Sequence, residues 1–167
     1  MKSETTDDLQ IRFAVVEDVP LILDFIRKLA EYEHMLDKVV ATEEVLREWL
    51  FEKGKAEALI GEINGEPVAF ALFFHNFSTF LGRGGIYIED LYVHEESRGK
   101  GIGRKMLEFL ARLALERGCG RLEWWCLDWN KSSIAFYLSL GAVAMSDWTV
   151  YRVTGDALKN LANESQV

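Results

Sequence analysis

The sequence has few of the residues and runs that mark specialised classes of protein. It contains two cysteines and two prolines in 167 residues, which excludes a disulfide framework and a proline-rich or collagen-like chain. The longest uninterrupted apolar run, residues 68–74, is far shorter than the roughly 20 residues that cross a bilayer. The N-terminus is acidic and has no apolar stretch of the kind found in secretory signals. These absences favour a reducing, cytoplasmic compartment and no membrane partner.

Positive charge and metal-binding patterns are also scarce. The chain has 19 lysines and arginines against 27 aspartates and glutamates, a formal net charge of −8. Because nucleic-acid binding depends on neutralising phosphates, we expect no nucleic-acid partner, and a cationic partner suits the charge better. The three histidines are scattered, and neither HExxH nor CxxC occurs, so we predict no metal. No GxSxG sequence supports an acyl-serine route.

What is present is typical of one soluble α/β domain. Hydrophobic residues make up 49% of the chain, enough for a core, and no linker or repeat divides it. We therefore expect a single domain over residues 1–167, with short flexible termini at about 1–8 and 163–167. The strands expected from apolar patterning are 9–15, 56–63, 67–77, 85–93, 121–127, 142–144 and 149–153. The expected helices are 18–32, 42–50, 102–117, 130–140 and 156–162.

Two local patterns fix how these elements connect. Asn64-Gly65 lies between two strand-like runs and predicts a tight hairpin turn, because both residues tolerate positive φ. The strand, helix and strand over residues 85–127 predict one parallel crossover. Together the hairpin and the crossover predict a mixed sheet.

The segment 86–105, IYIEDLYVHEESRGKGIGRK, combines three features that point to chemistry. Its strand carries two adjacent acids, Glu89 and Asp90, although strands are depleted in acids. A turn with alternating glycines and basic residues then opens a long helix. Free amides at a helix start bind anions, and glycines let the anion come close, so we predict a phosphate site. The alternative is an ordinary solvated helix start.

The phosphate motif is neither a Walker loop nor a dinucleotide fingerprint. GxxxxGK[ST] is absent, and Arg104 and Met106 stand where GxGxxG requires its third glycine. What remains, residues 98–103, reads R-x-x-G-x-G. This pattern resembles the pyrophosphate-binding motif of the GNAT acetyltransferase superfamily, whose members use acetyl-coenzyme A.

The resemblance extends over roughly residues 11–153. EYE at 31–33, IED at 88–90, DWN at 128–130 and the FY…GA pattern at 136–142 are similar to the spermidine/spermine acetyltransferase branch, which includes enzymes for diamines and for thialysine. It implies a single-domain α/β GNAT fold with a mixed central sheet of about six to seven strands flanked by helices. It also implies acetyl-CoA as cosubstrate, held between two splayed central strands, and a homodimer.

The resemblance also implies roles for individual residues. Tyr137 matches the general acid, and main-chain groups of Leu91, Tyr92 and Val93 match those that contact the acetyl-pantetheine arm. The remaining expected cosubstrate-binding residues are Arg98, Gly99, Lys100, Gly101, Ile102, Gly103 and Arg104 for the pyrophosphate, and Asn130, Ser132 and Ser133 for the far side of the arm. The expected substrate-binding residues are Tyr32, Glu33, Glu89, Asp90 and Trp125. Two stretches depart from the family pattern: Asn130-Lys131-Ser132 replaces Asn-Glu-Pro, and Glu123-Trp124-Trp125 is altered.

The chemistry of amine acetylation gives these residues tasks. An alkylamine with a pKa near 10.4 arrives protonated, so some group must accept a proton. A carboxylate such as Glu89, directly or through water, is a sensible acceptor if partial burial raises its pKa. If the strand bulges near Tyr92 or Val93, a main-chain amide there is left to stabilise the oxyanion. Tyr137 then donates a proton to the departing thiolate. We predict direct acetyl transfer to a primary amine of a small polyamine or diamine-like molecule.

Plainer interpretations of the same residues remain open at this point. Tyr137 and the tryptophans are also suited to a core. Glu89 and Asp90 point to opposite faces of a regular strand, so one of them is then merely structural. The acceptor is alternatively a thialysine-like lysine analogue, another amino compound or a protein amine. A further alternative is a coenzyme-A-binding regulator without turnover.

Overall fold

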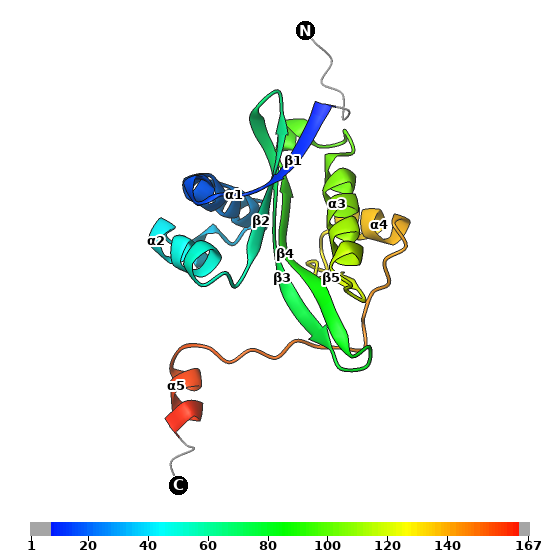
Figure 1. Ribbon diagram of the computed structural model, residues 1–167. Coiled ribbons are helices and arrows are strands. Elements are labelled where there is room, and N and C mark those ends of the chain that lie inside the picture. The colour runs from blue at the N-terminus through cyan, green and yellow to red at the C-terminus, as the bar shows by residue number, and fades with distance from the viewer. Residues whose placement is uncertain (1–7, 164–167) are drawn as a thin grey trace. The chain divides into compact units, whose positions relative to one another are not determined.

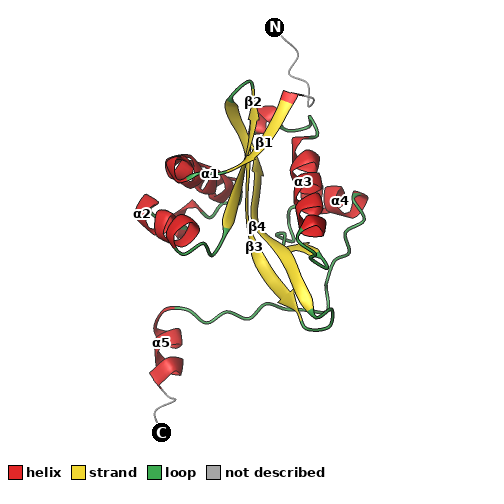
Figure 2. Ribbon diagram, viewed as in Figure 1, coloured by secondary structure: helices red, strands yellow, loops and turns green. Residues whose placement is uncertain are grey.

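The computed structural model describes residues 8–163 and contains one five-stranded mixed sheet (Figures 1 and 2). The strands, in spatial order, are β1 (Leu9–Phe13), β2 (Glu57–Ile63), β3 (Glu66–Ser78), β4 (Arg83–Val93) and β5 (Leu122–Trp124). The helices are α1 (Val19–Tyr32), α2 (Glu43–Arg47), α3 (Ile102–Glu116), α4 (Lys131–Ser139) and α5 (Gly155–Asn163). Short turns add η2 (Val16–Asp18), η3 (Leu36–Lys38), η4 (Glu48–Glu52) and η5 (Glu95–Ser97). Residues 1–7 and 164–167, which include most of the termini expected to be flexible, lie outside the described residues.

The chain divides into two compact units between Trp125 and Cys126. The first unit holds the whole sheet with α1, α2 and α3, and the second holds α4 and α5. No helix within residues 8–163 has the length and apolar content needed to cross a bilayer.

The connections within the sheet are as predicted. β2 and β3 form an antiparallel hairpin, and Asn64 and Gly65 in its turn have φ values of 53° and 81°. β3 pairs with β4 in the antiparallel sense, whereas β5 pairs with β4 in parallel after the α3 crossover. The fold is therefore the expected mixed α/β sheet flanked by helices.

Helices α1 and α2 cover one face of the sheet and α3 covers the other (Figures 1 and 2). On the face covered by α1 and α2, here called the α1 face, Phe25 stacks on Phe70 with ring centroids 5.4 Å apart. Leu72 and Tyr92 belong to the same buried cluster. On the opposite face α3 buries Met106, for which Gly61 leaves space, since a Cβ there would lie 3.2 Å from the Met106 sulfur. The α1 face matters for the site, because the strand side chains beyond the end of α1 share it.

The sheet has five strands in the described residues, not six to seven, because the expected strands 142–144 and 149–153 are not strands. Both segments belong to the second unit, whose described regular elements are α4 and α5 alone. A strand needs a neighbour to complete its ladder of hydrogen bonds, and nothing within that unit provides one. The β propensity of Thr149, Val150 and Tyr151 is therefore not sufficient.

The start of α1 also differs in detail from the prediction. β1 ends at Phe13, and Asp18 makes no side-chain cap on α1. The Asp18 carboxylate instead accepts two hydrogen bonds from Arg12, at 2.7 and 2.9 Å, and one from the Val15 amide. The predicted cap at Thr42 is confirmed, since its hydroxyl accepts from the Val45 amide.

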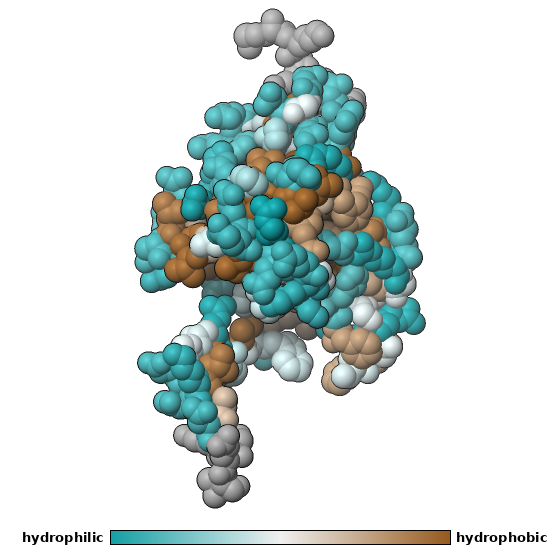
Figure 3. Space-filling model, turned by 60° about the vertical axis from the view of Figure 1, so that its left-hand side comes forward, coloured by the Kyte–Doolittle hydropathy of each residue, from teal (hydrophilic) through white to brown (hydrophobic). Residues whose placement is uncertain are grey.

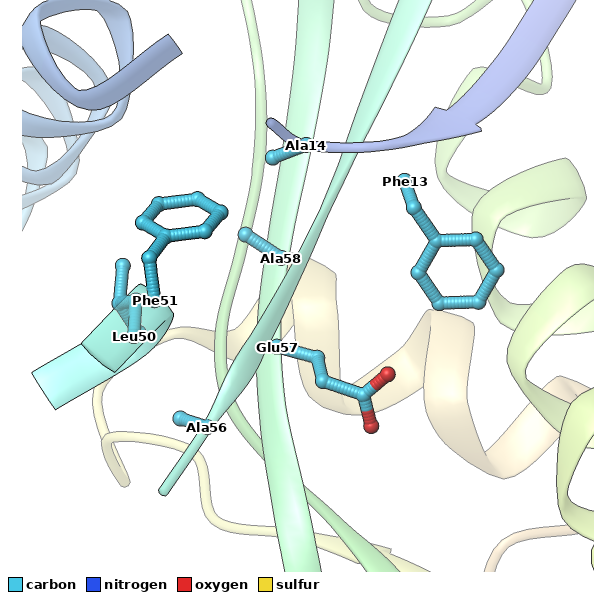
Figure 4. A pocket seen from close by; sticks show the side chains of 7 residues that line it. All are labelled: Phe13, Ala14, Leu50, Phe51, Ala56, Glu57 and Ala58. Atoms are coloured by element: carbon cyan, nitrogen blue, oxygen red, sulfur yellow. The ribbon is translucent and has the colours of Figure 1, made fainter. Parts of the chain in front are cut away.

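A cavity of about 300 Å³ lies between η4 and the start of β2. Figure 4 shows Phe51 and Phe13 on opposite sides of β2, with the Glu57 side chain on the Phe13 side. The Glu57 carboxylate accepts two hydrogen bonds from Arg117, at 2.6 and 2.9 Å, and this pairing lowers the pKa of Glu57. The other lining residues are Ala14, Leu50, Ala56 and Ala58. With its one charged group already paired, this cavity offers no reactive chemistry.

The outer surface over α1 and α2 mixes apolar and charged side chains (Figure 3). The exposed large apolar residues here are Met35, Leu36, Val40, Val45 and Trp49. They lie in η3, in α2 and η4, or between these elements.

Candidate active site

Strands β4 and β5 separate after a short paired stretch. Their parallel register runs from Ile86 opposite Leu122 to Ile88 opposite Trp124, where β5 ends. β4 continues to Val93, so beyond Ile88 it pairs with β3 alone among the described strands. Main-chain groups on that open side of β4 are available to an extended ligand. Leu91, Tyr92 and Val93, the residues expected to contact the pantetheine arm, lie in this stretch.

A β-bulge lies at Glu89. Leu72 is opposite Asp90 and Phe73 is opposite Ile88, so Glu89 is the extra residue on β4. The bulge expected near Tyr92 or Val93 thus lies earlier on the strand. Bulges re-aim the side chains on either side of them, and here the shift decides which acids face the site.

The bulge puts Tyr87 and Asp90 on one face, although a regular strand would turn residues three apart to opposite faces. Their partners on β3 are Phe74 and Leu72, which are two residues apart and therefore share a face. Leu72 packs in the cluster that α1 covers, so this is the α1 face. The 5.3 Å between the Phe74 and Tyr87 ring centroids agrees with this arrangement.

Asp90 lies in an environment that favours its protonated form. Burial, followed by the charges of Glu89 and Glu33, raises the pKa of Asp90 to about 7. Glu33 follows the last residue of α1, and burial raises the pKa of its carboxyl too. A carboxyl with a pKa near neutrality is suited to exchange protons with a substrate. From the sequence, Glu89 is the expected proton acceptor and Asp90 only a binding residue, but the Glu89 side chain is exposed.

An aromatic wall continues the α1 face away from Asp90. Tyr87 contacts Phe74 and also Trp125, whose ring centroid is 6.2 Å away in an edge-on arrangement. Trp125 is 45% exposed, which leaves part of its ring open to a ligand. Burial, followed by the charges of Glu89 and Glu123, raises the pKa of Tyr87. Aromatic faces next to acids suit an alkylammonium chain. Trp125, an expected substrate-binding residue, lies against Tyr87, which is on the same face as Asp90.

The glycine turn leaves main chain uncovered at the start of α3. Gly99 and Gly101 have φ values of 75° and 78°, and no side chain caps the helix at Gly101. A Cβ at Gly99 would meet no atom within 4 Å, and one at Gly103 would meet only Val93, at 3.9 Å. The first amides of a helix have no partner within it. The turn is therefore suited to a diphosphate, for which residues 98–104 are the expected ligands.

Arg98 is held differently from the other cations of this turn. Its Nε donates to the Val93 carbonyl oxygen at 2.9 Å. Its guanidinium lies 4.7 Å from the Tyr32 ring centroid and 5.3 Å from that of Tyr92. Arg98 thus joins the end of β4 to the end of α1 and brings the expected substrate residue Tyr32 next to the turn. Arg104 Nη1 lies 3.7 Å from Glu108 Oε1, one turn further along α3.

The remaining predicted residues lie in the second unit. Tyr137 is on α4, with its ring centroid 5.5 Å from that of Phe136. Asn130 caps this helix: its side chain accepts from the Ser133 amide and the Ser132 hydroxyl, both at 3.4 Å. The cap accounts for the local conformation of these three polar residues. The roles of Tyr137 and of the cap residues toward substrates remain predictions.

Other chemistry has little support in the part of the chain that is described. No group of three or more histidine, cysteine, aspartate or glutamate side chains in residues 8–163 is arranged to hold a metal ion. Neither Cys119 nor Cys126 forms a disulfide within the described residues. The acids that the structure brings together in this region are Glu33, Glu89 and Asp90.

Replacing Gly99 by alanine tests the glycine turn. The new Cβ meets nothing in the protein, but it forces an L-residue to positive φ, at a cost of about 1–2 kcal/mol. We expect acetyl-CoA to bind at least about 10-fold more weakly, because an anion then approaches the main chain less closely. Gly118→Ala, at φ 68° after the other end of α3, is the matched control and should lose stability alone. Calorimetric titration measures both variants, and equal affinities would contradict the assignment.

Comparison with known proteins agrees with this geometry. The model of the acetyltransferase (GNAT) family matches residues 23–142. A thialysine N-epsilon-acetyltransferase from Bos taurus is 40% identical over 93% of this chain and 98% of its own length. An L-ornithine N5-acetyltransferase from Arabidopsis thaliana is 31% identical over 90% of this chain and 86% of its own.

Solved structures show the same architecture. An integron cassette protein from the mobile metagenome of V. cholerae superposes with a TM-score of 0.78 at 27% identity, covering 93% of this chain and 98% of the other. The family match spans α1, the sheet from β2 to β5, the glycine turn and α4. The chain therefore belongs to the GNAT family and is an acetyl-CoA-dependent N-acetyltransferase.

Proposed function

We propose that the acetyl acceptor is a primary amine at the end of a short alkyl chain on a small molecule, as in diamines, ornithine and thialysine. The observation that carries this proposal is Asp90, turned by the bulge at Glu89 onto the α1 face beside the β4–β5 opening. The relatives named for thialysine and L-ornithine support amino compounds of this length. For this reason we place amino acids with a terminal amine ahead of the longer polyamines.

The charges on the α1 face support a cationic acceptor. Glu33 and Glu89 both act on Asp90 through their charge, so three carboxyl groups lie close enough to influence one another. A cluster of carboxylates raises the local concentration of ammonium ions, and a bound ammonium balances its negative charge. Tyr32, with its ring against Arg98, lies next to Glu33 in the chain and forms the wall toward the glycine turn.

In the proposed reaction, the bound ammonium gives one proton to Asp90, and Glu89 helps to hold the cation. The neutral amine attacks the thioester carbonyl carbon, so that a C–N bond forms and the C–S bond breaks with its electron pair on sulfur. Tyr137 donates a proton to this thiolate and regains one as the nitrogen loses its second proton. The products are the N-acetylamine and the free thiol, and the proton on Asp90 returns to solvent.

Positioning the two substrates supplies much of the rate in this scheme. The open side of β4 from Glu89 to Val93 and residues 99–104 would hold the cosubstrate, which supplies the activated acetyl group. We further propose that residues 1–167 act as one N-acetyltransferase domain, which is supported by a family match that runs across the boundary between the two units.

A thiol-release assay with a panel of amines tests the proposal. We expect turnover with ornithine, thialysine and putrescine, weaker turnover with spermidine, and none with peptides that offer only an α-amine. Turnover restricted to peptides would make the protein a protein acetyltransferase. Binding of acetyl-CoA without thiol release for any amine would make it a regulator.

A further inference from the structure

A pair of opposite charges lies at the far end of the aromatic wall. Arg121 directly precedes β5, and its Nε contacts Glu123 Oε1 at 2.7 Å. Asn76 on β3 donates from its side-chain amide to the same oxygen at 3.0 Å. A side chain from β3 and one from the residue before β5 therefore hold the Glu123 carboxylate in place.

This pair shares the α1 face with Tyr87 and Asp90. Glu123 is opposite Tyr87 in the β4–β5 register, and neighbouring partners across a sheet point to the same side. Asn76 is two residues beyond Phe74 on β3 and so lies on the same face. The charged pair and the acids of the candidate active site therefore face one continuous surface.

Gly85 makes the space that the arginine occupies. A Cβ at this position would lie 2.6 Å from Asn76 Oδ1 and 3.3 Å from Arg121 Cγ. Any other residue would displace one of these side chains. The glycine thus leaves room for the Arg121 side chain beside Asn76.

The pair is open to a ligand and contributes little as a structural contact. The side chains of Arg121 and Glu123 are 40% and 31% exposed, and exposed ion pairs stabilise a fold by about 0–1 kcal/mol. An α-amino acid carries the complementary charges next to each other, a carboxylate for the guanidinium and an ammonium for the carboxylate. Guanidinium groups bind carboxylates through paired hydrogen bonds, which gives such a site geometric selectivity.

The spacing along the sheet fits a short amino acid. The positions opposite Asp90 and Tyr87 on β3 are Leu72 and Phe74, which are about 7 Å apart at the usual rise of a strand. Glu123 is the register partner of Tyr87 across β4 and β5. The α-amine and the terminal amine of an extended ornithine or thialysine are about 6–8 Å apart. A terminal amine at Asp90 therefore places the α-ammonium at Glu123 and the carboxylate toward Arg121.

We propose that Arg121 and Glu123, with Asn76 as a positioning residue, bind the α-carboxylate and α-ammonium of an amino acid whose terminal amine is acetylated. The inference rests on the proposed function and narrows it, because a diamine has no group for Arg121. This site makes the enzyme prefer the amino acid to the diamine that lacks its carboxylate.

The matched substrates ornithine and putrescine test the proposal, because they differ by one carboxylate. We expect the wild-type protein to have a KM for ornithine at least about 10-fold below that for putrescine. Arg121→Ala should raise the ratio of the KM for ornithine to the KM for putrescine by about 10- to 100-fold. The kcat for ornithine should change far less. Glu123→Gln, which keeps the side-chain shape, should weaken ornithine binding in a calorimetric titration. Arg112→Ala, an exposed arginine on α3, is the control and should leave the ratio as in wild type.

Two results would overturn this inference and leave the proposed function intact. One is a wild-type preference for putrescine, and the other is an equal rise of both KM values in Arg121→Ala at an unaltered thermal midpoint. Absence of thiol release with every short amine would instead overturn the proposed function, and this inference with it.

Discussion

Replacing Asp90 by asparagine is expected to lower kcat/KM for the amine by roughly 10²- to 10⁴-fold at pH 7. The amide keeps the size of the side chain but accepts no proton, so the bound ammonium stays protonated and cannot attack. Acetyl-CoA affinity should remain near that of wild type, because Asp90 faces the amine. Steady-state kinetics with calorimetry separates the two effects. Glu116→Gln, at an exposed position on α3, is the control, and a loss of less than threefold in Asp90→Asn would remove Asp90 from proton transfer.

The pH dependence follows from the raised pKa of Asp90, about 7. Below that pH the carboxyl is protonated and no longer accepts a proton, so kcat/KM should fall tenfold for each unit of decrease. In Asp90→Asn, kcat/KM should no longer show this tenfold fall for each unit of decrease in pH. A wild-type profile that stays flat down to pH 5 would contradict the role of Asp90.

The same substitution should stabilise the protein at alkaline pH. The pKa of Asp90 is about 7 in the folded protein and 3.8 in the unfolded chain, so the folded state binds the proton more tightly. The cost of the buried charge is therefore fully present above pH 7, decreases as the pH falls, and is absent below about pH 4. At pH 8 the free energy of unfolding of Asp90→Asn should rise by on the order of 2 kcal/mol, and near pH 4 it should not rise. Denaturant titrations at the two pH values measure the difference.

Replacing Tyr137 by phenylalanine is expected to lower kcat by roughly 10²- to 10⁴-fold if its hydroxyl protonates the thiolate. The ring and its contact with Phe136 are retained, so α4 should remain folded. Affinity for acetyl-CoA should change little. Tyr151→Phe, in the same unit but outside α4, is the matched control.

A leaving group with a lower thiol pKa provides a second test of Tyr137. Such a thiolate departs without help, so the loss in Tyr137→Phe should shrink with an activated acetyl thioester. An unchanged rate with acetyl-CoA itself would take Tyr137 out of the mechanism and return it to a packing role.

The sequence alone is most informative about local features of the fold, which depend on residues adjacent in the chain. Asn64-Gly65 determines its own turn, since both residues adopt positive φ, and the flanking strands follow. The glycines at 99 and 101 adopt positive φ before α3, as the motif requires. The resemblance seen in residues 86–105 is confirmed at the level of the family.

Features that depend on distant pairing were not predictable in the same way. The bulge at Glu89 exists only in the register with Leu72 and Phe73, so the sequence alone could not show that Tyr87 and Asp90 share a face. The pKa of Asp90 is raised first by burial, and the charge of Glu33, which follows α1 and is distant in the chain, adds to the effect. The signal that was available is the pair of adjacent acids inside an apolar strand. The contacts of Arg98 with Tyr32 likewise join segments far apart in the chain.

Binding of a bisubstrate conjugate, coenzyme A joined through an acetyl bridge to the terminal amine of ornithine, tests most directly that thioester and amine meet at the β4–β5 opening. If the glycine turn and the α1 face form one site, wild-type protein should bind the conjugate at least about 10-fold more tightly than coenzyme A. Gly99→Ala should weaken both ligands. A conjugate that binds no more tightly than coenzyme A itself would contradict the account.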